Sequence, residues 1–410
     1  MRISTNQIFL QGLNGMLTQQ IKTLKLQQQL SSQKKIQSPS DDPIAAAQID
    51  MMKRRISDTE NLQKNRDAAV GELSFEESVL ANVINVLQRL RELQVQAGNT
   101  ALSETDRTAM SEEAQNILGQ LVDLGNTTDS NGYYLFSGSK TTTQPFTMNA
   151  GQYIYNGDQT QRFQLISSGL QLPVNDNGSD IFMRIPNGNG TFTVGPTATI
   201  NSGSAVADTG SVVNAAAYVK DDYTLSFALN SSNQLVVMVN GLATGPVIPP
   251  TGLPNDAPLY QAGAAINFNG IQLTITGTPQ PGDSFAINPT QNESIFSTAM
   301  RIVANLTQSF STARDKALVQ TENNQLMEQL DSALNNILNF RAQLGARLNQ
   351  LDVADQINGD VIEISQETLS TLEDVDLAEA AVRLNLQQVY LQAAQQSFAK
   401  IQGLTVFNYI

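Results

Sequence analysis

The segment that decides the fold runs from Leu372 to Gln402 and reads LEDVDLAEAAVRLNLQQVYLQAAQQSFAKIQ. At about 100° per residue, its apolar residues form two rows along a predicted helix. One row contains Leu372, Val375, Val382, Leu386, Val389 and Ala393, and the other contains Leu377, Leu384, Leu391 and Phe398. Val382 and Leu384 differ by about 200° on a helical wheel, so the rows face opposite ways. One neighbouring helix cannot cover both rows, and the sequence therefore predicts two partners for this helix.

A helix that is apolar on two sides lies either inside a domain or between chains. From Leu384 to Ile410 the only charged side chain is that of Lys400. The surface between the rows can therefore pack closely without the cost of desolvating ions. An ordinary core helix and a polymerisation helix both fit this segment, and the rest of the chain must decide between them.

The composition closes off most catalytic chemistry. The 410 residues include no histidine, cysteine or tryptophan. The chain therefore has no thiol nucleophile, no imidazole base, no Ser-His-Asp triad, no His/Cys zinc site and no disulfide. Carboxylate-only chemistry remains open, but we predict no catalytic residue, no cofactor and no metal site.

The charge is distributed unevenly along the chain. The net charge is −14, yet residues 1–40 carry +5 and the remainder carries −19. A chain this acidic offers no large phosphate-neutralising face, so we expect no nucleic-acid partner. No apolar run reaches the length of a membrane span, and the first thirty residues lack the apolar core of a cleavable signal peptide. We expect no membrane insertion, and any export must use another route.

Residues 1–33 are predicted to form an N-terminal polymerisation helix. Its assembly residues stand in heptad-like positions and are Leu10, Leu13, Leu17 and Leu24. A membrane-surface helix is the alternative, although glutamines flank the row. The doubly striped C-terminal segment is the expected partner.

Residues 34–43 are predicted to be a linker between two rigid pieces. Pro39 and Pro43 interrupt any continuous helix, and Pro43 suits the first turn of the next one. Either Asp41 or Asp42 can cap that helix. Cation binding by the two acids is the alternative to capping.

Two helical regions flank the middle of the chain. Residues 44–136 contain a long helix from Ile44 and, after a capping box at Ser103 and Asp106, a second helix antiparallel to the first. In residues 289–373, apolar residues again recur three and four positions apart from Asn292 onwards, which predicts a return to helix. Adjacent acids such as Glu76 and Glu77 point apart on a helix, so we expect solvated faces rather than an acid/base pair.

The middle of the chain has β character. Residues 137–288 contain no glutamate, twelve of the fourteen prolines lie between Pro145 and Pro289, and Asn-Gly pairs recur there. The clearest hairpin is AINFNGIQLTIT, where Asn269-Gly270 separates two alternating strands. We predict an inserted β domain, with a possible junction between two lobes in residues 195–220. NDNGSD at 175–180 does not match calcium-loop spacing and is expected to be a turn.

The predicted fold class is therefore mainly α with an inserted β domain. Long antiparallel helices from the N- and C-terminal parts form a coiled-coil-like rod. Residues 374–410 end the chain as a C-terminal polymerisation helix, whose assembly residues are Val375, Val382, Leu384, Leu386, Val389, Leu391 and Phe398.

Several local sequences resemble the bacterial flagellin family, and within it the members at the hook–filament junction. LSSQKKIQSPSDDPIAAAQ at 30–48 resembles the family's N-terminal block, with Gln33 where glycine is often found. LDSALNNILNFRAQLGARLNQLD at 330–352 and LEDVDLAEA at 372–380 resemble its C-terminal helical block and acidic hinge. LQAAQQSFAKIQGLTVFNYI at 391–410 is more similar to the junction-member ending than to that of flagellin. GTPQPGDSFAINP at 277–289 is similar to a strand-return segment. We expect no conflict from Gln33, because the first helix can continue to Pro39.

The resemblance implies a secreted structural protein of the extracellular hook–filament junction. It implies unfolded export through the flagellar type III apparatus, guided by the N-terminal segment. The implied partners are hook-associated protein 1, flagellin, neighbouring copies in a ring and a cytoplasmic export chaperone on the C-terminal helix.

From the rows themselves we expect segments 1–33 and 374–402 to be largely disordered in the free monomer and to fold on assembly. Three other functions stay open. The chain can be flagellin itself, it can carry a surface adhesive module on a flagellin-like rod, or it can hold a carboxylate-only enzyme in the insert.

Overall fold

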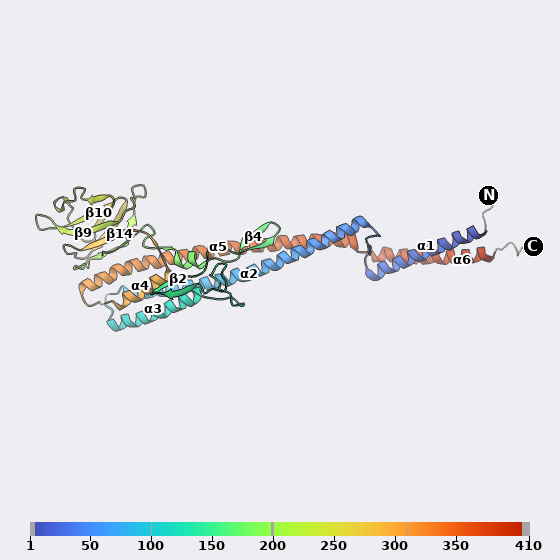
Figure 1. The fold of residues 1–410 in the computed structure, drawn as a ribbon, viewed down its shortest axis with the longest axis horizontal. Helices are drawn as coiled ribbons and strands as arrows, with labels where there is room; N and C mark the ends of the chain where they lie inside the picture. The colour runs from blue at the N-terminus through green and yellow to red at the C-terminus, as the bar shows by residue number, and fades with distance from the viewer. Residues whose placement is uncertain (1–4, 100, 198–200, 309, 404–410) are drawn as a thin grey trace, which may run out of the picture. The chain divides into compact units, whose positions relative to one another are not determined.

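The computed structural model describes residues 5–99, 101–197, 201–308 and 310–403, and confirms the expected mainly α fold with a β-rich middle (Figure 1). The first four and last seven residues of the predicted polymerisation helices lie outside the described residues. The described helices are α1 (Thr5–Ser32), α2 (Pro43–Ala97), α3 (Glu104–Gly125), α4 (Ile295–Thr307), α5 (Ala313–Glu373) and α6 (Leu377–Gly403).

The chain divides into two compact units. We call Met1–Arg66, Leu165–Leu170 and Asp352–Ile410 the terminal unit. We call Asp67–Gln164 and Gln171–Leu351 the central unit. The division falls inside α2 and α5 rather than at helix ends, so each of these helices supplies residues to both units.

In the central unit, α2 and α5 are long because few helix breakers interrupt them and their core spacing is regular. Within α2, Leu73, Leu80, Leu87 and Leu90 are fully buried. In α5 the fully buried residues follow the same spacing and include Leu326, Leu330, Ala333, Ile337 and Leu344. Gly345 and Gly359 do not end α5, as expected, because a single glycine in a helix costs only about 1 kcal/mol.

The remaining helices begin at identifiable caps. The capping box expected at Ser103 and Asp106 opens α3. The return to helix differs from expectation, because Asn292–Glu293 forms strand β15 and α4 starts after the cap residue Ser294. α4 then ends at Thr307, so α4 and α5 are separate helices rather than one continuous run.

Two hairpins and an aromatic cluster precede the main sheets. Strand β1 (Phe146–Asn149) pairs with β2 (Gln152–Tyr155), and β3 (Phe163–Ser167) pairs with β4 (Leu170–Pro173). Phe146 lies 4.9 Å from the ring of Phe296 in α4 and 5.3 Å from Phe182 in the short helix η1 (Ser179–Met183), measured between ring centroids. All three rings are fully buried. This cluster forms an apolar core between the first hairpin and α4.

The second β-rich part is a two-sheet sandwich. One sheet has the order β11 (Gly245–Ile248), β10 (Leu235–Gly241), β9 (Tyr223–Leu229), β14 (Ser284–Pro289) and β6 (Phe192–Pro196). The other contains β12 (Ala265–Phe268), β13 (Ile271–Thr276) and β7 (Val206–Ala207), with β8 (Ser211–Val212) also on β13 and the 3-10 turn η2 (Pro254–Asp256) nearby in sequence. Alternate residues of these strands fill the core between the sheets, including Leu225, Phe227, Leu273, Phe285 and Ile287.

The sequence predicted several of these strands correctly and misplaced one boundary. Asn269 and Gly270 have φ values of 43° and 78°, as a two-residue hairpin turn requires. The expected lobe junction in 195–220 is wrong, because β6 already pairs with β14 and therefore belongs to the sandwich.

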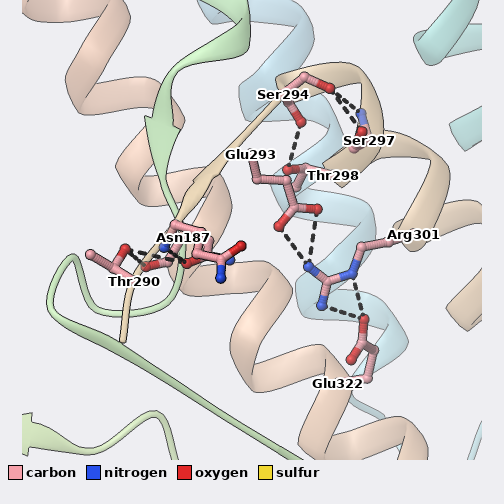
Figure 2. A network of polar contacts seen from close by, with 9 residues as sticks. Asn187, Thr290, Glu293, Ser294, Ser297, Thr298, Arg301 and Glu322 are labelled. Atoms are coloured by element: carbon pink, nitrogen blue, oxygen red, sulfur yellow. Dashed lines mark hydrogen bonds and ion pairs between the residues drawn. The ribbon is translucent and has the colours of Figure 1, made fainter. Parts of the chain in front are cut away.

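Two paired strands form the neck between the sandwich and the helices, and Figure 2 shows the polar contacts beside them. Strand β5 (Ile185–Pro186) enters the sandwich region and pairs with β15, which leaves it. Beside this pair, the Thr290 hydroxyl donates to the Asn187 carbonyl oxygen at 2.7 Å. Arg301 in α4 forms ion pairs with Glu293 at 2.9 Å and with Glu322 in α5 at 2.7 Å. The polar contacts therefore tie the returning strand to two helices.

Candidate assembly surface

Helices α1 and α6 form an antiparallel pair in the terminal unit (Figure 1). The rings of Phe9 and Phe398 lie 5.3 Å apart, and the Gln387 side chain donates to the Gln19 side chain. Gly12 leaves room for Phe398, because a Cβ atom at that position would lie 2.9 Å from the ring. The pairing is therefore fixed by complementary large and small residues.

The two rows of α6 have different environments. The row facing α1 is buried or half-buried and has coiled-coil spacing; it comprises Ala380, Leu384, Gln387, Leu391, Ala394 and Phe398. The opposite row is exposed: the residue-exposed fractions are 60% for Val382, 48% for Leu386 and 59% for Val389. Val375 is half-buried just before α6. One of the two partners expected for α6 is therefore α1, and the second row is free in the single chain.

The predicted row of α1 does not face α6. Leu10, Leu17 and Leu24 are exposed, with fractions of 50%, 45% and 52%, and Leu13 is half-buried. The face directed at α6 is less apolar than the predicted row and comprises Gly12, Met16, Gln19, Thr23 and Leu26. Sequence reasoning selected the most apolar row, whereas the pair uses a row of small and amide side chains. Gly12 and Gln19, seven residues apart, were the sequence features that could have indicated the face of α1 that contacts α6.

The described ends of the chain are helices that pack on each other, and the disorder expected of them in the free monomer stays a prediction. Each of α1 and α6 covers one row of the other, and this is the pairing of the N- and C-terminal segments that the sequence predicts. The outer rows still lack cover. The unmet apolar surface is therefore one row for each helix rather than two.

A short backbone joint holds the ends of α1 and α5 together. The Lys35 amide donates to the Glu373 carbonyl oxygen at 2.6 Å, and the Val375 amide donates to the Gln33 carbonyl oxygen at 3.0 Å. Lys34 and Asp374 form an antiparallel β-bridge between these two bonds. The predicted linker and the acidic hinge are therefore hydrogen-bonded to each other.

Glu373 is the charged centre of this joint. Its carboxylate is paired with Lys34 and, at 3.0 Å, with Lys53 of α2, and its side chain is only 9% exposed. Burial by itself would raise the pKa of Glu373, but the two ammonium groups outweigh burial and hold the pKa below its usual value. The carboxylate is therefore ionised and bound to one lysine of the linker and one of α2.

Gln33 shows that α1 does not continue to Pro39. The helix ends at Ser32, and Gln33 adopts φ = 59° in the left-handed region. This is the position after a helix where glycine is favoured, because it has no Cβ atom to clash. The expectation that α1 can continue to Pro39 is wrong, whereas the turn forms without glycine because Gln33 accepts the positive φ, and the bond from Val375 depends on this turn.

The two linker acids have separate roles. One Asp42 carboxylate oxygen accepts from the amides of Ile44 and Ala45 at 3.1 and 3.0 Å, so Asp42 caps α2 and Pro43 is its first residue. Asp41 accepts from the amides of Gln37 and Ser38 and pairs with Lys25 at 2.7 Å. A hollow of about 690 Å³ lies beside this turn, and Pro39, Pro43 and Glu373 are among the residues that line it.

The described residues contain no group of three or more acidic side chains placed to bind a metal, and none of their helices is long and apolar enough to cross a membrane. In the 175–180 segment, Asp176 is buried and forms a two-bond ion pair with Arg347. Glu76 differs from the expected solvated face, because it is fully buried and neither carboxylate oxygen has a hydrogen bond of normal geometry. Its neighbour Glu77 pairs with Arg341.

Known proteins match both the helical ends and the middle of this chain. Family models for the bacterial flagellin N-terminal and C-terminal helical regions match residues 3–141 and 327–410. Flagellar hook-associated protein 3 of Salmonella typhimurium is 27% identical over 408 residues, covering 100% of this chain and 99% of that protein. Bacillus subtilis flagellin is 30% identical, but over 141 residues that cover 34% of this chain and 46% of the flagellin.

Solved structures give the same result. The crystal structure of flagellar hook-associated protein 3 from Legionella pneumophila has 54% identity and a TM-score of 0.78, covering 79% of this chain and 98% of that chain. The Xanthomonas campestris FlgL structure has 28% identity and a TM-score of 0.70, covering 78% and 99%. The similarity to these proteins includes the β-rich middle, whereas the similarity to Bacillus flagellin does not extend beyond 141 residues.

Proposed function

Because the chain belongs to the flagellar hook-associated protein 3 family, we propose that it joins the flagellar hook to the filament by polymerising through its terminal helices. It is a structural axial protein of the flagellum and not an enzyme. The observation that carries the proposed mechanism is the pair of rows on α6, of which one packs on α1 and the other is exposed. The exposed row is then the surface that a neighbouring subunit covers.

The assembly residues on α6 divide into two roles under this proposal. Leu384, Leu391 and Phe398 hold α1 and α6 together, so that the pair acts as one rigid piece. Val382, Leu386 and Val389 contact the neighbour. Full burial of such side chains is worth roughly 1.5–3 kcal/mol each before ordering costs are subtracted.

The exposed row of α1 has the corresponding role on the other helix. Leu10, Leu17 and Leu24 face away from α6, so they are available to a second neighbour, and half-buried Leu13 lies at the edge of the row. Pro39, Asp41, Asp42 and Pro43 set the turn between α1 and α2, and thereby the direction in which α1 presents this row.

We extend the proposal to the partners and the route of export. Hook-associated protein 1 lies on the hook side, flagellin on the filament side and further copies of this chain lie around the ring. Before assembly, a cytoplasmic chaperone covers α6, since an exposed apolar row promotes aggregation. The chain leaves the cell through the flagellar type III apparatus, and the absence of cysteine is compatible with passage as an extended chain. The mature site is the extracellular hook–filament junction.

Deletion tests the proposed function directly. Cells that lack the chain should keep their hooks and release flagellin filaments into the medium, as seen by electron microscopy and by immunoblotting of the supernatant. Attached filaments of normal length in the deletion strain would contradict the proposed function. Assembly of long filaments from the purified protein alone would favour flagellin, and sedimentation would detect them.

Matched charge substitutions test the mechanism. Val389→Asp should abolish filament attachment, because it places a carboxylate in the exposed row of α6. Leu242→Asp is the control, since Leu242 in the turn after β10 is 81% exposed but lies in the central unit. Equal loss of swimming in both variants would contradict a specific role of the exposed α6 row, because a charge at any exposed apolar residue would then have the same effect. Truncation after Val382 should leave a soluble chain that no longer attaches filaments.

A further inference from the structure

The first turns of α2 carry two exposed aliphatic side chains on one flank of the helix. Ile44 and Met51 are 75% and 57% exposed. At about 100° per residue they lie within about 20° of each other, and two helical turns, or about 10 Å, separate them along the axis. Aliphatic side chains gain free energy when a partner removes them from water. We call these two residues the knob pair.

The opposite flank of α2 borders the hollow of about 690 Å³ beside the linker turn. Four of the α2 residues that line this hollow lie within about 80° of one another on the helix surface; they are Pro43, Ala46, Asp50 and Lys53. Their centre lies about 130° around the helix from the knob pair. The knob pair therefore cannot fill the hollow of its own molecule.

The hollow is partly apolar and large enough for side chains of a partner. Its other lining residues include half-buried Ile36, the ring of Pro39 and buried Ile49. Its volume falls within the range of pockets that enclose small molecules, about 300–1,000 Å³. Two aliphatic side chains therefore fit in it.

The hollow and the knob pair lie at the same level of α2. The α2 residues that line the hollow run from Pro43 to Lys53, and the knob pair occupies positions 44 and 51. A second copy placed beside the first, with its α2 parallel and unshifted, brings its knob pair opposite the hollow. A head-to-tail contact that needs no shift along the helix axis can repeat around that axis and close a ring.

The free charges beside the two surfaces are complementary. Arg55 lies within about 40° of both knob residues, and Asp50 stands on the wall of the hollow. Both side chains are exposed, and neither has an ion pair or hydrogen bond among the described residues. Five residues, or about 7.5 Å of helix, separate them along the axis, a distance that the two side chains together span. Asp58 follows on the knob flank, but it lies beyond the last α2 residue that lines the hollow.

We propose that the knob pair of one copy enters the hollow of the next copy around the ring, with Arg55 of the first copy beside Asp50 of the second. The contact is heterologous, because each copy presents the knob pair on one flank of α2 and the hollow on the other. The inference rests on the proposed function, since it names the lateral surface by which neighbouring copies meet.

Cysteine crosslinking tests the contact without background, because the natural chain has no cysteine. The double variant Ala46→Cys/Met51→Cys, in intact flagella treated with a mild oxidant, should give a ladder of covalent multimers on a non-reducing immunoblot. The two positions lie more than about 7 Å apart on one helix, too far for a disulfide within one chain. Motile cells whose double-variant protein stays monomeric would overturn the contact and leave the proposed function intact.

Two kinds of control accompany the crosslink. Each single variant should stay monomeric, because knob meets hollow and not a second knob. The pair Met51→Cys/Asn61→Cys should also stay monomeric, since Asn61 is exposed on α2 but does not line the hollow. A ladder in any of these controls would contradict the specific contact.

A photoreactive probe identifies what covers the knob pair. A benzophenone maleimide attached to Met51→Cys and illuminated in assembled flagella should join two copies of this chain. Mass spectrometry of the adduct should find the crosslinked peptide among residues 32–53. Adducts only to a different flagellar protein would contradict a second copy as the occupant.

Filling the hollow from its own side gives a measurement that needs no cysteine. Ala46→Trp should reduce the number of filament-bearing cells by about tenfold, because the indole occupies the space that the knob pair needs. Adding Met51→Ala, which shortens the knob, should recover part of the loss, and Asn61→Trp should have no effect. Unchanged filament counts in Ala46→Trp, or no recovery in the double variant, would contradict the inference.

Discussion

The terminal and central units differ in how much of their apolar surface is buried within the chain. In the central unit, the aromatic cluster, the sandwich and the helix interfaces are filled by fully buried side chains. Among the described residues of the terminal unit, the buried apolar residues are Ile49, Ile166, Ala354 and Ala380. That unit nevertheless exposes large apolar residues on α1, α5 and α6. The central unit is stabilised by its own contacts, whereas the terminal unit leaves apolar rows exposed that, under the proposed function, neighbouring subunits cover.

The comparison predicts separate thermal transitions for the isolated chain. Local stability follows the number of buried contacts, and regions with few of them open at low free energy. We therefore expect the α1–α6 pair to lose helix before the central unit melts. Assembly then stabilises the terminal unit by mass action, because a neighbour binds only the ordered pair.

The largest expected effect is on the core of the central unit. Phe296→Ala should lower its free energy of unfolding by about 3–5 kcal/mol, because the fully buried ring contacts Phe146, Tyr153 and Phe182. Calorimetry should show a lower temperature for the main transition. Leu386→Ala on α6 is the control and should leave that transition unchanged. Similar shifts in both variants would remove the distinction between the units.

The next effect concerns the buried carboxyl group of Glu76. Burial raises the pKa of Glu76 well above its usual value, and nearby Asp176 adds to the shift, while Arg347 and Arg162 oppose it. Because this acid's pKa is raised on folding, the stability that protonated Glu76 contributes to the central unit is fully present below about pH 4.5. That contribution is lost as pH rises through the folded-state pKa.

Glu76→Gln should therefore stabilise the central unit by about 1–3 kcal/mol at neutral pH, since it removes a poorly satisfied buried acid. The gain should shrink at acid pH, as measured by urea unfolding from pH 4 to pH 8. Glu77→Gln is the matched control, and it should destabilise slightly by losing the pair with Arg341. A neutral-pH loss in Glu76→Gln would mean that the ionised carboxylate is needed.

A smaller effect is expected at the joint in the terminal unit. The lowered pKa of Glu373 means that its contribution is present above the usual carboxyl pKa of 4.5 and is lost as pH falls through the folded-state value. Glu373→Gln should cost below about 1 kcal/mol, because both partner lysines are about half exposed. Hydrogen-exchange protection factors of the Lys35 and Val375 amides should fall at neutral pH, and Glu367→Gln should leave them unchanged.

The smallest effect is expected at Gln33. Gln33→Gly should stabilise the joint by about 0.5 kcal/mol, because glycine accepts the positive φ without a Cβ clash but loses more freedom on folding. Gln33→Val should weaken it by more than that amount. Protection of the Val375 amide reports both changes. A loss of protection in the glycine variant would show that the glutamine side chain itself supports the turn.

Sequence periodicity predicted the features that depend on a repeating pattern. The burial spacing of α2 and α5, the capping box at Ser103 and the Asn269-Gly270 hairpin follow from local rules. The opposite rows of α6 were also visible, because residues on one helix have a known angular relation. These features need no knowledge of what packs against them.

The errors arose where a distant segment decides the environment. The face of α1 that contacts α6 carries Gly12, which leaves room for the Phe398 ring, and Gln19, which accepts from Gln387. The more apolar leucines of α1 lie on another face. Glu76 looked solvated because the buried Asp176 lies one hundred residues away in sequence. Gln33 looked harmless because the Val375 bond that fixes its turn comes from the other end of the chain.

The paired strands β5 and β15 at the neck have an architectural consequence. They bring the first and last residues of the sandwich side by side. The helical part of the chain therefore meets the sandwich only at two adjacent strands. Domains with adjacent termini tolerate exchange. The sandwich is therefore a replaceable module, and a foreign domain of similar termini can be grafted at Asn187 and Thr290 to decorate the flagellum while the helical body keeps its register.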